Sequence, residues 1–150
     1  MNGKMDAKNF EEVKRQLAGK GYRLTKQRLA ILEVLRSSDA HPDAEWVYRE
    51  VKKVLPHVSL GTVYRSLEVL RDAGLIASLE VGPRRRYDGN TSEHQHILCT
   101  GCGRVVDIHL SPSLLDELER QAASEADFTI TGHRVEFYGL CPQCRRKAGK

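Results

Sequence analysis

Two pairs of cysteines, each with the spacing Cys-x-x-Cys, carry all of the thiol chemistry in this 150-residue chain. They are Cys99 with Cys102 and Cys141 with Cys144, and there is no fifth cysteine. Four thiolates complete a tetrahedral structural zinc site, and a two-residue gap lets both sulfurs of a pair reach one ion. The four cysteines therefore predict one closed, structural zinc site.

A redox motif or two disulfides is the competing interpretation, because Cys141-Pro-Gln-Cys144 has the form of a thioredoxin-type motif. That motif belongs at a strand-to-helix turn early in a βαβ unit, whereas here it precedes a basic tail. No apolar run reaches the length of a signal-peptide core or a membrane span, so we expect a cytoplasmic protein. Thiol pairs persist there as metal ligands, which favours zinc.

A second group of side chains suited to metal binding begins at His94-Gln-His96. In an extended segment residues i and i+2 point to the same face, so both imidazoles can reach one ion. His41, Asp88 and Asp107 are further candidates. Three imidazoles and two carboxylates prefer Fe(II), Mn(II) or Zn(II) to a thiolate-seeking ion. The alternative for a lone His-x-His is a pair of ordinary histidines.

The remaining histidines carry weaker signals. His57 and His109 are expected to be surface residues. His133 has two interpretations, an ordinary structural histidine or a third metal site with Glu93 and either Asp116 or Glu117.

The first half of the chain has the apolar periodicity of short helices followed by a hairpin. Helices are expected over 10–20, from the cap Thr25, from about residue 44 to Pro56, and over 59–73, where Ser59 is the cap. The third of these is expected to turn Trp46, Val47, Val51, Val54 and Leu55 inward. Segments 76–81 and 84–87, joined by a Gly82-Pro83 turn, read as a β-hairpin. This order is typical of a winged helix-turn-helix.

In such a fold the fourth helix would lie in the major groove of DNA. Its exposed face offers phosphate- and base-contacting side chains, namely Ser59, Thr62, Tyr64 and Arg65. Arg84, Arg85 and Arg86 are expected at the tip of the hairpin, where a wing meets the DNA backbone. The alternative is a generic helical domain with a solvated basic loop.

Charge divides the chain in the same place. Residues 1–86 hold 17 Lys and Arg against 11 Asp and Glu, whereas residues 87–150 hold 7 against 9. A basic half suits a polyanionic partner, and the acidic half holds all of the cysteines. The alternative is uneven surface charge without a role.

The second half reads as a small α/β unit. Strands are expected over 97–99, 105–108 and 133–140, with a helix from Pro112 to about residue 126. We therefore predict an α+β protein, with a winged-helix DNA-binding domain at 1–87 and a metal-binding dimerisation domain at 88–150.

The small α/β unit of the second half cannot close its own sheet, so we predict a homodimer that reads palindromic operator DNA. Because His41 and Asp88 belong to the first half or its boundary, metal binding would fix the two domains in one orientation, as a metal-controlled switch requires.

Several motifs together resemble the ferric uptake regulator (Fur) family, from about residue 13 to residue 144. They are Gly21-Tyr-Arg-Leu-Thr-Lys-Gln-Arg28, Ala40-His-Pro-Asp-Ala44, Thr62-Val-Tyr-Arg-Ser-Leu67, Glu93-His-Gln-His-Ile-Leu-Cys99 and Cys99-x-x-Cys-Gly-x-Val-Val-Asp107. The resemblance implies a dimeric bacterial repressor with structural zinc on the four cysteines and a regulatory site of His41, Asp88, His94, His96 and Asp107. It also implies that Arg23 reaches the minor groove and that Tyr64 lies among the major-groove contacts.

Two aspartates distinguish the branches of this family. Peroxide sensors of the PerR type carry aspartate where the iron sensors usually carry glutamate, and here both positions, Asp88 and Asp107, are aspartate. In that branch Fe(II) and peroxide convert a ligand histidine, matched here by His41 or His94, to 2-oxo-histidine, which releases the metal and then the operator. Arg65 departs from this pattern and looks more like the iron-sensing branch. The alternatives are Fe(II)-responsive repression of iron uptake genes and, after it, zinc or manganese sensing.

Enzymatic function is not expected. A zinc hydrolase needs an open coordination position, and a deaminase needs His-x-Glu followed by Pro-Cys-x-x-Cys, whereas a site of four thiolates is closed. A zinc-ribbon interaction module would leave the basic half and the His/Asp group without a role.

Overall fold

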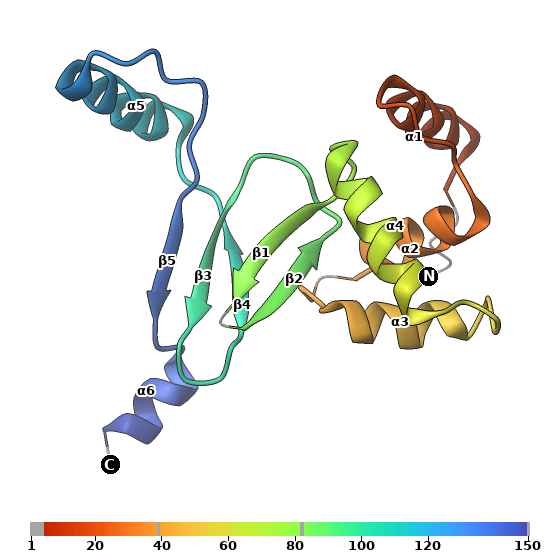
Figure 1. Cartoon of the computed structure of the whole chain (residues 1–150). Coiled ribbons are helices and arrows are strands. Elements are labelled where there is room, and N and C mark those ends of the chain that lie inside the picture. Colours follow the sequence, from red (N-terminus) through yellow and green to blue (C-terminus); the bar gives the residue numbers. More distant parts are fainter. Residues whose placement is uncertain (1–4, 39, 82, 150) are drawn as a thin grey trace. The chain divides into compact units, whose positions relative to one another are not determined.

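The computed structural model describes residues 5–38, 40–81 and 83–149, and its helices and strands are labelled in Figure 1. The chain divides into two compact units, Met1–Thr91 and Ser92–Lys150. Among the described residues, the first unit holds four helices and a hairpin, and the second holds three strands and two helices. Mixed α+β architecture with this order of elements agrees with the fold class predicted from the sequence. In the described part of the chain, no helix has both the length and the apolar character needed to cross a membrane.

Each helix of the first unit begins at a side chain that caps it. The helices are α1 (Ala7–Gly19), α2 (Lys26–Arg36), α3 (Ala44–Lys52) and α4 (Leu60–Asp72). Asp6, Thr25, Asp43 and Ser59 accept a hydrogen bond from the backbone N–H three residues on. Such caps satisfy donors that have no partner inside the helix. The predicted caps Thr25 and Ser59 are confirmed.

The apolar faces of these helices meet in one core. Leu17, Ile31, Val47 and Leu67 are fully buried, each from a different helix. One prediction is wrong here, since Val54 is 65% exposed. The helix α3 ends at Lys52, so helical spacing no longer directs Val54 toward the core.

The predicted hairpin is confirmed as β1 (Ala77–Val81) and β2 (Arg84–Asp88), which pair antiparallel. The Gly82 position of the predicted turn lies outside the described residues. Arg84 faces Val81 at the turn end of the pair, whereas Arg86 lies inside β2 opposite Leu79. The expectation that Arg86 lies at the tip is therefore wrong. Its guanidinium instead donates to the carbonyl of His41 at 3.1 Å.

The second unit is a three-stranded sheet of order β4-β3-β5. Its elements are β3 (Gln95–Cys99), β4 (Val105–Ile108), α5 (Pro112–Ala126), β5 (Glu136–Gly139) and α6 (Pro142–Ala148). Strand β4 pairs antiparallel with β3, and β5 pairs parallel with β3 on the other side. The chain crosses from β4 to β5 through α5, which has the predicted bounds. The short α6 was not predicted.

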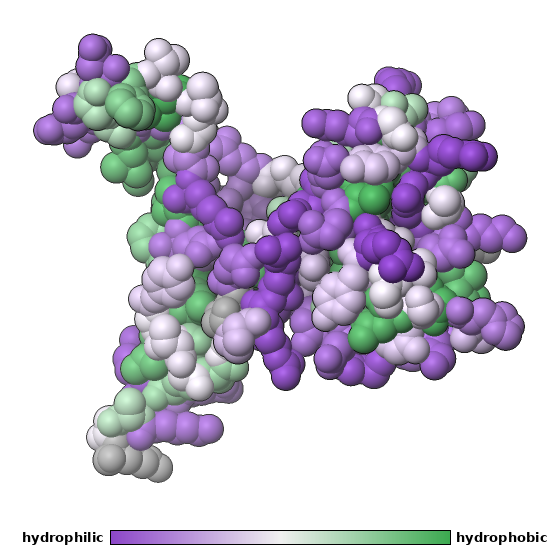
Figure 2. Space-filling model, viewed as in Figure 1, coloured by the Kyte–Doolittle hydropathy of each residue, from purple (hydrophilic) through white to green (hydrophobic). Residues whose placement is uncertain are grey.

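This unit leaves much apolar surface uncovered. Among its described residues, Cys99 and Leu115 are the buried members of the hydrophobic set. Large apolar side chains are exposed on the sheet, on α5 and on the segments beside them. Figure 2 shows apolar surface gathered over α5 and beside β5. The exposed residues are Ile97, Val106, Leu114, Leu118, Phe128, Phe137, Tyr138 and Leu140. A soluble monomer rarely exposes so much contiguous apolar surface.

Candidate metal centres and nucleic-acid interface

The four cysteines converge in the second unit. Their sulfur atoms lie within 4.8 Å of one another, and the Sγ atoms of Cys102 and Cys141 are 3.9 Å apart. A Zn–S distance of about 2.3 Å in a tetrahedron corresponds to sulfurs about 3.8 Å apart. The thiols therefore fit one zinc ion, and they come from the end of β3, the turn after it and the start of α6.

Backbone N–H groups prepare two of these sulfurs for the thiolate form. The N–H of Cys141 donates to Sγ of Cys99 at 3.3 Å, and this bond contributes most to lowering the pKa of Cys99 to about 6. The N–H of Cys144 donates to Sγ of Cys141, the cap of α6, and lowers its pKa. The neighbouring sulfurs of Cys141 and Cys99 raise the pKa of Cys144 to about 12. Four adjacent thiolates repel one another, and a divalent cation removes that repulsion.

A glycine between the first two cysteines makes room for the cluster. A Cβ atom on Gly101 would lie 2.9 Å from Sγ of Cys144. The turn closes on itself through the N–H of Gly103, which donates to the carbonyl of Cys99 at 2.9 Å, and Gly103 has a positive φ of 78°. This compact turn brings Cys99 and Cys102 to the same side.

In the first unit, His41 and Asp88 form a buried pair. The Nε2 atom of His41 lies 3.3 Å from Oδ2 of Asp88, and both side chains are buried. Asp88 ends β2, and its Oδ1 accepts from the N–H of Asn90 at 2.9 Å. The loop carrying His41 is attached to β2 because the N–H of Tyr87 donates to the carbonyl of Pro42 at 2.9 Å.

In the second unit, His94, His96 and Asp107 form a triad. Oδ1 of Asp107 lies 3.2 Å from Nε2 of His96 and 3.5 Å from Nε2 of His94. The two imidazole rings are 4.6 Å apart, and the Nδ1 of His94 lies 2.6 Å from the carbonyl of Ser92. The residue between them, Gln95, is buried and accepts from the N–H of Leu110. The predicted alternation of this segment is therefore confirmed.

The histidine His133 lies in an acidic setting. Its Nδ1 is 2.6 Å from Oε1 of Glu119, and its Nε2 is 3.5 Å from Oε1 of Glu93. The hydrogen bond with Glu119 contributes most to raising the pKa of His133. Of the expected partners, Glu93 is present, whereas Glu117 pairs with Arg120. Glu119 was missed, although it lies on the same face of α5 as Asp116, three residues earlier. The third metal site stays a prediction, and His57 and His109 are exposed as expected.

The side chains predicted to contact DNA cluster at the start of α4. The cap Ser59 bonds Thr62, whose hydroxyl accepts from Arg65 at 3.3 Å, and Tyr64 is 47% exposed. A groove of about 620 Å³ runs between this face and the start of α2, and Gln27 and Arg28 line it, two residues that the sequence interpretation missed. Arg28 also bonds the carbonyl of Arg23, which is itself exposed.

The hairpin arginines are engaged within the first unit. Arg84 pairs with Asp43 at 3.2 Å, and Arg85 pairs with Glu68 at 3.0 Å and with Glu80 at 2.8 Å. These pairs are exposed, so they hold the side chains only weakly and leave the guanidinium groups able to exchange partners.

Comparisons with known proteins agree with this organisation. The chain is 41% identical over 144 residues to the peroxide operon regulator of Bacillus subtilis (strain 168), which covers 95% of this chain and 98% of that protein. The crystal structure of the Campylobacter jejuni peroxide stress regulator is 29% identical, with a TM-score of 0.68, and covers 93% of this chain and all of that one. The structure of the Helicobacter pylori ferric uptake regulator is 22% identical and covers 97% of each chain with a TM-score of 0.79. This likeness shows that the two chains share a fold. The sequence model of the Ferric uptake regulator family matches residues 19–138. The chain therefore belongs to the ferric uptake regulator family, as its motifs indicated.

Proposed function

We propose that the chain is a metal-dependent transcriptional repressor that senses peroxide through Fe(II)-catalysed oxidation of a ligand histidine, which derepresses oxidative-stress genes. One observation carries this proposal: the chain is 41% identical, over 95% of its length, to a peroxide operon regulator. Aspartate at both carboxylate positions, Asp88 and Asp107, supports the same branch.

Structural zinc is the first part of the proposal. It would be held by Cys99, Cys102, Cys141 and Cys144, whose separations suit four-thiolate coordination. A closed site of this kind has no open position for a substrate, so its role is to stabilise the second unit.

A regulatory ion is the second part. We assign it to His41, Asp88, His94, His96 and Asp107. The support is local to each unit, since an imidazole Nε2 already lies beside a carboxylate oxygen in both. This set of nitrogen and oxygen donors suits Fe(II) or Mn(II). One ion ligated from both units would favour a single orientation of the DNA-binding unit, which is the element that switches.

Peroxide sensing follows from what the ligand histidines would undergo. Fe(II), if held by these residues, would supply the chemistry that cleaves the O–O bond of peroxide. The carbon between the two ring nitrogens of His41 or His94 would gain one oxygen atom from H2O2, the hydrogen of that carbon would end on a ring nitrogen, and the second oxygen would leave as water. His41 is 4% exposed, so an oxidant formed beside it meets the ring before it meets solvent. The oxidised ring is a poorer ligand, and loss of the metal releases the operator.

Operator recognition is assigned to the first unit of each subunit in a homodimer. Ser59, Thr62, Tyr64 and Arg65 would contact the major groove, Arg23 the minor groove, and Arg84 and Arg85 the backbone. The apolar surface of the second unit supports dimerisation, because a second copy would cover it. Two-fold symmetry would then match a palindromic operator.

An Fe(II)-responsive repressor of iron uptake genes is the second candidate. Arg65 in the recognition segment favours it, because that position resembles the iron-sensing branch. Zinc or manganese sensing follows as a third possibility within the same architecture.

Metal-dependent DNA binding tests the shared part of these proposals. An operator is selected from random duplexes with the Mn(II)-loaded chain, and binding is measured with and without Mn(II). His94→Ala should abolish the Mn(II) dependence and leave zinc content intact, whereas the exposed control His57→Ala should bind like the unmodified chain. Unchanged binding by the His94 variant removes that residue from the sensory site.

A further inference from the structure

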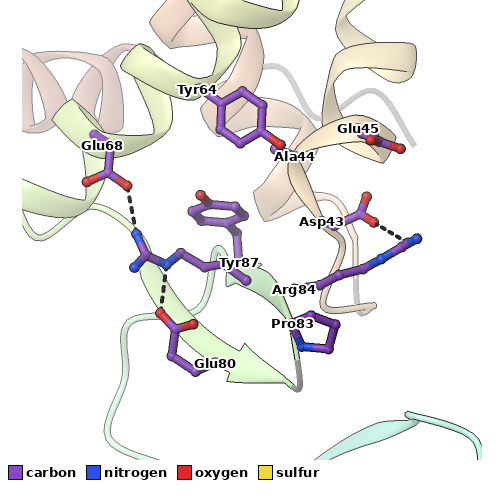
Figure 3. A pocket seen from close by; sticks show the side chains of 10 residues that line it. Asp43, Ala44, Glu45, Tyr64, Glu68, Glu80, Pro83, Arg84 and Tyr87 are labelled. Atoms are coloured by element: carbon purple, nitrogen blue, oxygen red, sulfur yellow. Dashed lines mark hydrogen bonds and ion pairs between the residues drawn. The ribbon is translucent and has the colours of Figure 1, made fainter.

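An open pocket in the first unit shares Tyr64, Arg84 and Arg85 with the proposed DNA contacts, but its other side chains have no role in the function proposed above. It lies between the start of α3, the middle of α4 and the hairpin, and Figure 3 shows it from close by. Its volume is about 420 Å³, within the range of small-molecule sites. The flat side chains of Tyr64, Tyr87 and Pro83, together with Ala44, supply apolar walls.

The hydroxyl of Tyr87 is the first group that points to a ligand. Tyr87 is only 2% exposed, and its ring belongs to the core, yet it lines this pocket. In the described part of the chain its hydroxyl makes no hydrogen bond, and Figure 3 shows it directed between Glu68 and Tyr64. Burial, with the charge of Glu68, raises the pKa of Tyr87, so the group stays a neutral donor and acceptor. The hydroxyl oxygen itself is not fully buried, so a ligand that fills the pocket can exchange a hydrogen bond with it.

The carboxylate of Glu45 is the second group. It lines the pocket and makes no ion pair or hydrogen bond with any described residue. Figure 3 shows it across the pocket from Glu68, with the two tyrosines between them. The other lining carboxylates are already paired, Asp43 with Arg84 and both Glu68 and Glu80 with Arg85. The excess charge of the pocket is therefore negative, which attracts a cation.

We propose that this pocket binds a small aromatic amine that carries a hydroxyl at the end opposite its ammonium group. The ammonium pairs with Glu45, the ring packs against Tyr64 and Pro83, and the hydroxyl exchanges a hydrogen bond with Tyr87. Glu45 then has a cationic partner, and the hydroxyl of Tyr87 has a hydrogen-bond partner. Because α4 and the hairpin both line the pocket, the bound amine bridges these two elements.

Tyramine and its analogues test this assignment by NMR titration of the full-length, zinc-loaded chain without DNA or regulatory metal. Tyramine should shift the ring signals of Tyr64 and Tyr87 and the methyl signal of Ala44 saturably. Phenethylamine, which lacks only the hydroxyl, should bind about fivefold more weakly, the usual contribution of one hydrogen bond. The charge-reversed 3-(4-hydroxyphenyl)propionate should not bind.

Two variants assign the ends of the ligand. Tyr87→Phe should bring tyramine down to the affinity of phenethylamine, because only the hydroxyl contact is lost. Glu45→Gln should weaken both amines about threefold and keep their ratio, as expected for an exposed ion pair. The control variant Glu11→Gln, which removes an exposed carboxylate on α1, should leave the affinities for both amines unchanged. The assignment is overturned by an absence of saturable shifts, by equal binding of the propionate, or by a preference for tyramine that survives in Tyr87→Phe. None of these outcomes depends on operator binding.

Discussion

The imidazole of His96 and the carboxylate of Asp107 lie 3.2 Å apart because the two residues are register partners across β3 and β4. Opposite residues of an antiparallel pair place their side chains on the same face. The turn between these strands is the first cysteine pair, with Cys99 as the last residue of β3. The turn that carries the first cysteine pair therefore fixes the register that sets this part of the proposed sensory site.

Zinc removal should unfold the second unit and, with it, the His96–Asp107 pair. Structural zinc contributes on the order of 10 kcal/mol of folding free energy in zinc-finger peptides. The second unit buries few apolar side chains that could stabilise it without zinc. Cys102→Ser should likewise lower zinc content and helical circular dichroism. The control variant Ser37→Ala, at an exposed serine in the first unit, should change neither the zinc content nor the circular dichroism. A second unit that stays folded with four free thiols contradicts the structural role of zinc.

Replacing Gly89 by alanine should destabilise the first unit at the segment that follows Asp88. A Cβ atom there would lie 2.7 Å from the carbonyl carbon and oxygen of Leu35, which is backbone and cannot rotate away. We expect a loss of about 1–3 kcal/mol in urea unfolding, as for other overpacked sites. The control is Gly132→Ala, because nothing lies within 4 Å of a Cβ added there. Equal stability of the two variants would show that the contact is not as close as described.

The hairpin, the caps Thr25 and Ser59, and helix α5 were predictable because each depends on local signals. Pro112 opens α5, and a serine cap precedes it. Helix α6 was missed because it has only seven residues and no apolar periodicity, and its start coincides with Cys141. Val54 was misplaced because apolar spacing alone does not show where α3 ends.

Protonation of His133 should stabilise the folded chain at low pH. Glu119 raises the folded-state pKa of His133 above its ordinary value of about 6.5. This contribution is therefore complete below the unfolded-state pKa and is lost as the pH rises through the folded-state pKa. NMR titration should give His133 a pKa above its ordinary value. In Glu119→Gln the pKa of His133 should fall, and an unchanged value would exclude this pair as the cause.

A charge on the uncovered apolar surface should produce monomers. Leu118 is 49% exposed on α5, so Leu118→Glu should fold normally and yet keep a second copy away. Sedimentation velocity should report a dimer for the unmodified zinc-loaded chain and a monomer for the variant. Glu125→Gln, an exposed substitution on the same helix, serves as the control. A dimer that persists in Leu118→Glu places the interface elsewhere.

The histidines and aspartates of the proposed sensory site were predictable as a group, but the pairing of His96 with Asp107 was not. His94 and His96 were found from their spacing, and the strand register then explains why Asp107 joins them. Glu119 as the partner of His133 was not predictable, since fourteen residues and a loop separate them. Such contacts depend on where a loop returns, which no local pattern encodes.

Intact-mass analysis after a low dose of peroxide tests the central claim most directly. The Fe(II)-loaded chain should gain one oxygen, on the peptide that contains His41 or His94, and the Mn(II)-loaded chain should gain none. The gain should disappear from the corresponding peptide in His41→Ala or His94→Ala. Oxidation confined to cysteine, or equal oxidation with both metals, would contradict peroxide sensing by a ligand histidine.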